Sequence, residues 1–205
     1  MERGKLVVVS GFSGTGKGTI IKQLIERYGY SLSISATTRA PREGEVDGRE
    51  YYFKSTEEFL SLVDYNGLIE WTKYVDNYYG TPRKFVEEEL AQGKTVILEI
   101  EVKGASNIKA QYPDAVLIFV TTKDIATLRE RLEKRGTETA EVINKRISRA
   151  ADEAELMDNY DYIIVNDDLE DCIDAVHSVI ISDDYKTENS LDFVKKIQGE
   201  LAEYK

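Results

Sequence analysis

The sequence predicts an α/β protein in which helices flank a central parallel sheet. Three short runs of almost entirely apolar residues predict buried strands, at 5–9, 95–100 and 115–120. Strands that are apolar on both faces are typical of parallel sheets, because helices cover both sides of such sheets. Segments with apolar residues at helical spacing follow the first strand and separate the other two, as repeated βαβ units require.

The composition fits one sizeable core and argues against several protein classes. The chain has 205 residues, of which 41% are hydrophobic and 32% are charged. No apolar run approaches the roughly 20 residues that span a bilayer, and the apolar patch at 6–9 is shorter than the core of a secretion signal. We therefore expect no membrane association and a cytoplasmic location.

Cysteine and histidine are nearly absent, and the net charge is strongly negative. One cysteine, Cys172, excludes an internal disulfide framework, and one histidine, His177, argues against a zinc site or a Ser-His-Asp triad. We interpret both as structural residues of the last core helix. The net charge of −11 argues against a nucleic-acid-binding surface. Most of the excess acid lies at 150–185, so basic side chains elsewhere can still gather around a small anion.

The N-terminal part predicts a strand, a glycine-rich turn and then a helix over 17–28, because apolar residues recur there at helical spacing. An extended segment follows at 30–35. The next stretch, 37–50, is polar and contains glycines, so we expect that it cannot pack as core.

The middle section predicts an inserted subdomain in which strands and a helix are mixed. A short strand is expected at 51–53. Ser55 and Glu58 have the spacing of a capping box, which predicts a helix from there to about residue 65. The turn at Asn66-Gly67 leads into a strand at 68–72.

The remaining part returns to alternating helices and strands. Thr81-Pro82 begins a helix that Gly93 ends, and another helix ends before Pro113. Helices are then expected at 127–134 and 138–157. Further on, the pattern predicts a short strand at 162–165 and an amphipathic helix at 169–180. The pattern weakens in the tail at 185–205, where we expect one short final helix.

A phosphate-binding loop is predicted between the first strand and the first helix. Residues 11–17 match the first seven positions of G-x-x-x-x-G-K-[ST]. Its backbone N–H groups can surround an oxyanion at the positive end of a helix, and Lys17 adds a mobile charge. A glycine-rich turn without a ligand is the alternative, and the strand–helix context argues against it. The candidate ATP-binding residues here are Gly11, Phe12, Ser13, Gly14, Thr15, Gly16, Lys17, Gly18 and Thr19.

The loop departs from the motif at its last position. Gly18 stands where a hydroxyl should hold Mg²⁺, and Thr19 follows it. We therefore take Thr19 as the candidate metal contact, either directly or through water, with the ion bound mainly by ATP phosphates and water.

The segments after the loop resemble guanylate kinases. The resemblance begins with the GMP-binding signature at 35–45 and 48–53 and covers, in order and spacing, residues 5 to about 184. It continues through 69–71, 77–80, 98–101, 135–139 and 165–167. It implies an enzyme that transfers the γ-phosphoryl group of ATP to GMP, with dGMP as a further substrate and Mg²⁺ accompanying ATP. Whether the enzyme is a monomer or a homodimer stays open.

The same resemblance implies a P-loop kinase fold in three parts, with a tail at 185–205 outside the kinase domain of 4–184. The core is expected at 4–34, 82–126 and 157–184. The inserted mixed α+β GMP-binding subdomain is expected at 35–81, and the helical lid at 127–156.

Two arginines form a candidate site for a second anion. Arg39 and Arg42 are three residues apart, and their guanidinium groups can hold a monophosphate. Tyr51 and Tyr79 offer hydroxyl groups for the remaining oxygens. The resemblance implies that these residues bind the GMP phosphate, and its signature includes Glu45, which we count with them. The alternative is that the arginines pair on a solvated loop with Glu43, Glu45 and Asp47.

Guanine presents two donors and one acceptor on its pairing edge, so carboxylates and hydroxyls are its natural partners. By resemblance, Glu70 and Glu101 match the acidic guanine contacts, and Ser35 and Thr81 match the hydroxyl contacts. Family members often have Asp at the position of Glu101 and Ser at that of Thr81. Thr81 is alternatively a helix N-cap. Glu99 lies on the same predicted strand as Glu101 and, by resemblance, near the metal or the acceptor phosphate.

Five arginines lie in the stretch that resembles the family's mobile lid: Arg129, Arg131, Arg135, Arg146 and Arg149. Phosphoryl transfer needs cations around the moving group. Arg135 and Arg146 are the best candidates, so the predicted catalytic residues are Lys17, Arg39, Arg135 and Arg146. Arg131 and Arg149 come next, Arg131 also being counted as an ATP contact, and Asn166 resembles an adenine contact.

A solvated helix with i,i+4 charge pairs is the alternative for the lid arginines. We prefer that interpretation for Arg129 and Lys134.

Three other functions remain as alternatives. A kinase of the same fold for another nucleotide or a sugar phosphate should lack the combined set of Ser35, Glu70, Thr81 and Glu101. A non-catalytic, protein-binding relative typically loses the loop lysine, whereas Lys17 is present. A GTP-driven switch lacks support because no second guanine-reading motif is found.

Overall fold

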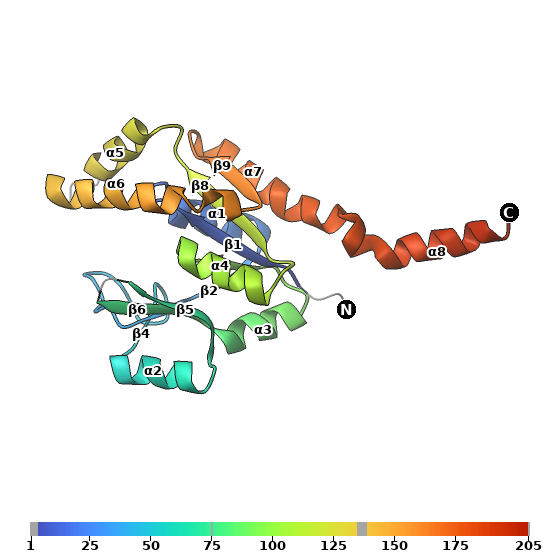
Figure 1. Cartoon of the computed structure of the whole chain (residues 1–205), viewed down its shortest axis with the longest axis horizontal. Helices are drawn as coiled ribbons and strands as arrows, with labels where there is room; N and C mark the ends of the chain where they lie inside the picture. Colours follow the sequence, from blue (N-terminus) through green and yellow to red (C-terminus); the bar gives the residue numbers. More distant parts are fainter. Residues whose placement is uncertain (1–3, 75, 135–138, 205) are drawn as a thin grey trace.

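The computed structural model describes residues 4–74, 76–134 and 139–204, and its centre is a five-stranded parallel sheet (Figure 1). The strands are β1 (Leu6–Gly11), β2 (Ser31–Ser33), β7 (Val96–Glu99), β8 (Val116–Thr121) and β9 (Tyr162–Val165). Their order is β2-β7-β1-β8-β9, and every neighbouring pair is parallel. The predicted α/β class with a central parallel sheet is therefore confirmed.

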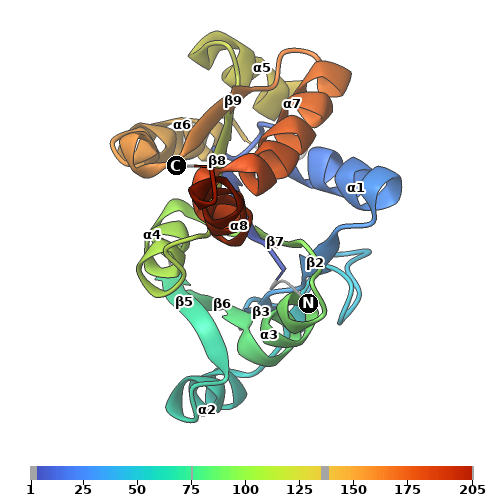
Figure 2. The ribbon, with the colours of Figure 1, turned by 90° about the vertical axis from the view of Figure 1, so that its right-hand side faces the viewer.

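Helices cover both faces of this sheet, as Figure 2 shows. They include α1 (Lys17–Tyr28), α3 (Arg83–Ala91), α4 (Val102–Gln111) and α7 (Leu169–Ser182). Successive side chains of a strand point to opposite faces. In β1, Val7 and Val9 accordingly pack with α1 and α7, whereas Leu6 and Val8 belong to the core that includes α3 and α4. The two apolar layers hold β1 at the centre of the fold.

A second, smaller sheet lies below the first in Figure 1. It consists of β3 (Ala36–Thr37), β4 (Tyr52–Phe53), β5 (Leu68–Tyr74) and β6 (Asn77–Pro82), in the order β4-β3-β6-β5. Helix α2 (Thr56–Asp64) packs on it through the fully buried ring of Phe59. The predicted capping box begins this helix: the backbone N–H of Glu58 donates to the Ser55 hydroxyl at 3.1 Å, and the backbone N–H of Ser55 donates to the Glu58 carboxylate at 2.7 Å.

Two expectations for this region are wrong. Thr37 is fully buried in β3, although the polar stretch that it begins was expected to stay outside the core. Thr81 is not the helix N-cap: it lies inside β6, and Pro82 occupies the N-cap position of α3. Both threonines are buried because their hydroxyl groups find partners within the small sheet, which local sequence patterns do not reveal.

Two helices form the part that was predicted as a lid, α5 (Ile125–Lys134) and α6 (Ala140–Ala154). The N-cap of α6 is Thr139, whose hydroxyl accepts a hydrogen bond from the backbone of Val142 at 3.4 Å. Ile143 and Ala150 turn toward the core. The interval between the two helices expected at 127–134 and 138–157 lies outside the described residues.

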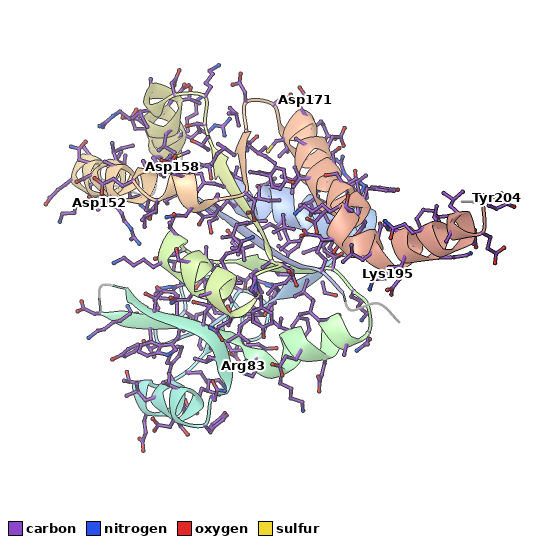
Figure 3. The ribbon with its side chains drawn as sticks, turned by 45° about the vertical axis from the view of Figure 1, so that its right-hand side comes forward. Arg83, Asp152, Asp158, Asp171, Lys195 and Tyr204 are labelled. Atoms are coloured by element: carbon purple, nitrogen blue, oxygen red, sulfur yellow. The ribbon has the colours of Figure 1, made fainter. Side chains whose placement is uncertain are left out.

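The C-terminal helix α8 (Leu191–Ala202) projects from the body (Figures 1 and 3). It follows α7 after two short 3₁₀ turns, Asp183–Tyr185 and Thr187–Ser190. None of its residues is buried, and Phe193 is 64% exposed. None of the helices that the structure describes is long and apolar enough to cross a membrane.

Because α8 buries no side chain, it should contribute little to the stability of the core. We expect that removing residues 191–205 changes the melting temperature by no more than about 2 °C in scanning calorimetry. As a control, Ile180→Ala truncates a side chain that is 2% exposed in α7, and should cost about 2–5 kcal/mol. A fall of more than about 5 °C on removing the helix would show that α8 packs on the body.

Candidate active site

The parallel pairing of β1 with β7 sets the position of the candidate site. Val9 lies opposite Glu99 in this register, so both strands end at the same edge of the sheet. The loop at 11–17 leaves β1 at this edge, and Glu99 and Glu101 leave β7 beside it. Open α/β sheets bind ligands outside the carboxyl ends of their strands. The structure therefore brings the predicted phosphate loop and two predicted acidic residues together.

The backbone of the loop has a form that only glycine adopts easily. Gly11, Gly14 and Gly16 have φ angles of 147°, 99° and 90°. A side chain at Gly11 would collide with the carbonyl oxygen of Val120, and one at Gly16 would press on the Asn166 amide at 2.8 Å. The loop ends directly at the N-terminus of α1, so its N–H groups and the helix dipole can act on the same anion.

Lys17 lies across this loop. Its Nζ donates hydrogen bonds to the carbonyl oxygens of Gly11 at 2.7 Å and Phe12 at 3.0 Å. Carbonyl oxygens are weaker partners for an ammonium group than phosphate oxygens are. A bound phosphate can therefore draw Lys17 away from these carbonyls without any change in the fold.

Asn166 hydrogen-bonds to the backbone of the phosphate loop. It is 4% exposed, and its Nδ2 donates to the carbonyl oxygen of Thr15 at 2.7 Å. The backbone carbonyl oxygen of Asn166 accepts a hydrogen bond from Arg131 Nη2 at 2.8 Å. The adenine contact expected of Asn166 stays a prediction, and the bracing contact is a role that the sequence did not reveal.

The predicted second anion site forms a cluster at the edge of the small sheet. The Arg39 guanidinium lies 5.4 Å from the ring centre of Tyr51, and the rings of Tyr51 and Tyr79 meet edge to face with centres 6.0 Å apart. Arg39 Nη2 also pairs with both carboxylate oxygens of Glu45, at 2.9 and 3.0 Å. This pairing lowers the pKa of Glu45 and raises that of Arg39. The alternative ion pair is thus present beside the residues of the predicted phosphate site.

Arg42 and Ser35 are less closely joined to this cluster. The backbone N–H of Arg42 donates to Glu45 at 2.7 Å, but the residue is exposed. Among the described residues, no hydrogen-bond or ion-pair partner is found for its guanidinium. Ser35 is half-buried beside β3, and its carbonyl oxygen accepts a hydrogen bond from Tyr52 at 2.9 Å.

Glu70 is a buried carboxylate with a neutral partner. It is 6% exposed, and the Thr81 hydroxyl donates to its Oε1 at 2.7 Å. Burial raises its pKa to about 7, and the hydrogen bonds from Thr81 oppose this rise. Its Oε2 lies so close to Gly104, in the first turn of α4, that an added Cβ there would be 2.7 Å away. No sequence pattern predicts this role of Gly104.

Glu99 is the last residue of β7, and Glu101 lies two positions after it. The Glu101 side chain is 44% exposed, and its Oε2 accepts a hydrogen bond from Arg149 at 3.0 Å. Loss of solvent and the neighbouring Glu153 raise the pKa of Glu101. Loss of solvent also raises the pKa of Glu99, and the Lys17 ammonium opposes this rise. Glu99 therefore lies near Lys17 and Gly18, and its expected place near the metal or the acceptor phosphate stays a prediction.

The lid arginines divide into three groups. Arg146 donates to the hydroxyl of Ser13 in the phosphate loop, and Arg149 reaches Glu101. Arg131 supports Asn166. Arg129 bonds to Asn144 on the exposed side, which agrees with its interpretation as a surface residue. Arg135 lies outside the described residues.

Lys134 and Lys145 form the surface pairs that were expected as the alternative for the lid. Lys134 pairs with Glu130 at 2.7 Å and Lys145 with Glu141 at 3.4 Å. The preference for a surface role of Lys134 is therefore confirmed.

The structural interpretation of the lone cysteine and histidine is also confirmed. Cys172 is buried in α7, and the His177 ring stacks on Tyr28 with ring centres 3.5 Å apart. The hydroxyl of Tyr30 shares a hydrogen bond with His177 Nδ1 at 2.7 Å. In the part of the chain that the structure describes, no group of three or more His, Cys, Asp or Glu side chains is placed to hold a metal ion.

Comparisons with known proteins agree on one family. A family model described as guanylate kinase matches residues 3–183. The chain is 45% identical to the guanylate kinase of Latilactobacillus sakei, over 97% of this chain and 99% of that protein. Identity to the guanylate kinase of Caldanaerobacter subterraneus is 44%, with 97% of each chain covered. The crystal structure of guanylate kinase from Anaplasma phagocytophilum matches with a TM-score of 0.76 and 32% identity, covering 91% of this chain and 89% of that one.

The buried carboxylate of Glu70 should cost stability at alkaline pH. The pKa of Glu70 is about 7 in the folded state and 4.5 in the unfolded state. Between pH 4.5 and pH 7, the folded state therefore binds the proton of Glu70 more tightly than the unfolded state does. Stability should therefore fall as the pH rises from 5 to 8. We expect Glu70→Gln to be more stable than the parent protein by about 1–3 kcal/mol at pH 8, with the gain lost at pH 5.

Calorimetric melting at the two pH values measures this difference. Glu57→Gln, on the exposed face of α2, is the matched control and should change little at either pH. A Glu70→Gln variant that is less stable than the parent at pH 8 would contradict the assigned cost.

Proposed function

Because the chain belongs to the guanylate kinase family and transfers the γ-phosphoryl group of ATP to GMP, we propose how its residues divide this task. The triphosphate binds at the loop of residues 11–17 with Lys17, and the GMP phosphate binds at Arg39, Arg42, Tyr51 and Tyr79. The observation that carries the proposal is the shared sheet edge, since β1 and β7 end side by side there. Glu45, which pairs with Arg39, completes the acceptor site.

The reaction needs no general base. The nucleophile is an oxygen of the GMP phosphate, which is already anionic near neutral pH. Catalysis then consists of positioning, charge neutralisation and exclusion of water. This agrees with a chain that has only one histidine, and that histidine is half-buried and in contact with two tyrosines.

The base is recognised by the carboxylates Glu70 and Glu101 and by the hydroxyls of Ser35 and Thr81. Guanine N1–H and its 2-amino group are donors, so they need acceptors. Glu70 supports this role because, among the described residues, Thr81 is the only one whose side chain hydrogen-bonds to it, and Thr81 offers a hydroxyl rather than a cation. A base without these donors would leave a buried carboxylate unpaired, which is costly.

The cations around the moving phosphoryl group are supplied from three places: Lys17 from the loop, Arg39 from the acceptor site, and Arg146 with Arg135 from the lid. The contact from Arg146 to Ser13 supports this proposal, since it brings the guanidinium to the phosphate loop. Arg131 and Asn166 would contribute to the ATP site from behind the loop.

Magnesium is proposed to enter with ATP. The described residues fit an ion held mainly by the nucleotide's phosphates and water, because no side-chain cluster could hold a metal by itself. Thr19, exposed in the first turn of α1, would offer its hydroxyl, and Glu99 lies close enough to Gly18 to act through water. The ion would neutralise phosphate charge during transfer.

Several finer assignments belong to the same proposal. The division into a core, a GMP-binding part at 35–81 and a lid at 127–156 implies that the two smaller parts close over the substrates. dGMP is a proposed second acceptor, since none of the assigned groups requires the 2′-hydroxyl. The cytoplasmic location and the choice between monomer and homodimer stay predictions.

Turnover with a panel of acceptors tests base recognition. We expect GMP and dGMP to be phosphorylated, and AMP, CMP and UMP to give kcat/KM values at least about 1,000-fold lower, because none of these three bases presents the two adjacent donors of guanine. Glu70→Gln should lower kcat/KM for GMP by about 100-fold and leave the KM for ATP within twofold. Unchanged GMP kinetics in Glu70→Gln, with Glu57→Gln as the control, would remove Glu70 from the guanine site.

Lys17→Met tests the phosphate loop. Methionine fills similar space without a charge, so we expect an unchanged melting temperature and a kcat at least about 100–1,000-fold lower. Lys22→Met on the exposed side of α1 should leave kcat unchanged. A Lys17→Met enzyme with nearly normal turnover would contradict the role given to this lysine.

A further inference from the structure

Arg149 connects the lid helix α6 to the end of strand β7. Its Nη2 donates to Glu101 Oε2 at 3.0 Å, and its Nε donates to Glu153 Oε1 at 3.1 Å. The side chain is 28% exposed, so the pair with Glu101 is only partly screened by solvent. Arg149 therefore has a partner in the proposed guanine site.

One face of α6 reaches both substrate sites. Arg146 and Arg149 are three residues apart, so they lie on the same side of the helix. Arg146 bonds to Ser13 in the phosphate loop, and Arg149 bonds to Glu101. The guanidinium groups of one helical turn thus touch the proposed ATP site and the proposed guanine site.

Glu101 lies among charges of both signs. Glu70 of β5 and Glu153 of α6 repel its carboxylate, whereas Lys17 of α1 and Lys103 of α4 attract it from farther away. Among the described residues, Arg149 is the only one that donates a side-chain hydrogen bond to Glu101. An opposite charge at this distance favours the ionised form of a carboxylate.

The geometry of the bond leaves room for a ligand. Arg149 uses one nitrogen and holds Glu101 Oε2, while no described side chain bonds to Oε1. A cavity of about 180 Å³ opens beside Glu101. It is lined by residues 72–73 of β5, by residues 101–103, and by Arg149, Asp152, Glu153 and Leu156. Asp152, which Figure 3 labels, marks this end of α6. A ligand donor that bonds to Oε1 therefore need not displace Arg149.

We propose that Arg149 is a positioning residue for guanine recognition: it holds Glu101 oriented so that the second carboxylate oxygen, Oε1, meets the donors of the base. This inference rests on the proposed guanine-binding role of Glu101. Because Arg149 comes from the lid, GMP binding and the lid position favour one another. Arg149 thus acts on the acceptor base, in contrast to the phosphate-binding role of Arg146.

Steady-state kinetics of Arg149→Ala test the proposal. We expect the KM for GMP to rise about tenfold and the KM for ATP to stay within twofold, because the bond from Arg149 orients a group of the proposed guanine site. Arg149→Lys keeps the charge and should recover part of the loss. Arg129→Ala, which removes an exposed lid arginine bonded to Asn144, is the matched control and should change neither KM.

A double-variant cycle separates this inference from the proposed function. If Arg149 acts through Glu101, adding Arg149→Ala to Glu101→Gln should raise the KM for GMP no further. An unchanged GMP KM in Glu101→Gln alone would overturn the guanine-binding role of Glu101. A raised KM for GMP in Glu101→Gln, together with a normal KM for GMP in Arg149→Ala, would overturn the inference and leave the guanine-binding role of Glu101 intact. Equal losses for ATP and GMP in Arg149→Ala would also overturn the inference.

Discussion

The parallel pairing of β1 with β7 is the constraint on which the site depends. It places Val9 opposite Glu99, so the phosphate loop after β1 and the carboxylates after β7 must leave the sheet at one edge. Apolar layers on both faces of the sheet fix this pairing, because a shift by one residue would turn Val7 and Val9 into the opposite core. The cation of Lys17 and the anion of Glu99 are neighbours for the same reason.

Around this edge, the chain keeps charged groups in surroundings that cost folding energy. Glu70 is buried with only a threonine hydroxyl as its side-chain partner, whereas Glu101 is drawn toward an arginine of the lid. A buried carboxylate that lacks a cation is poised to accept hydrogen bonds from a ligand. The small sheet and α6 can then be understood as two supports that bring acceptors to the base and cations to the phosphates.

The sequence predicted those parts of the site that local patterns define. The glycines of residues 11–17 have a spacing that only one kind of loop uses, and the capping box at Ser55 and Glu58 is equally local. The resemblance to guanylate kinases added Glu70 and Thr81 as partners of one base, and the structure places them in contact. The resemblance could not show that Thr81, with this contact, is a strand residue and not a helix cap.

Long-range contacts were beyond prediction. Asn166 lies 151 positions from Thr15, and Arg149 lies 48 positions from Glu101, so no spacing rule joins them. Gly104 faces Glu70 only because α4 packs beside β5. The amphipathic pattern of α8 likewise indicated a helix but not that it would project from the body.

A crystal structure with GMP and a non-hydrolysable ATP analogue would test the central claim most directly. The account predicts guanine against Glu70 and Glu101, the GMP phosphate at Arg39, and a phosphate oxygen about 3–3.5 Å from the γ-phosphorus held over Lys17. Guanine out of contact with both glutamates, or a GMP phosphate seated away from Arg39, would contradict it.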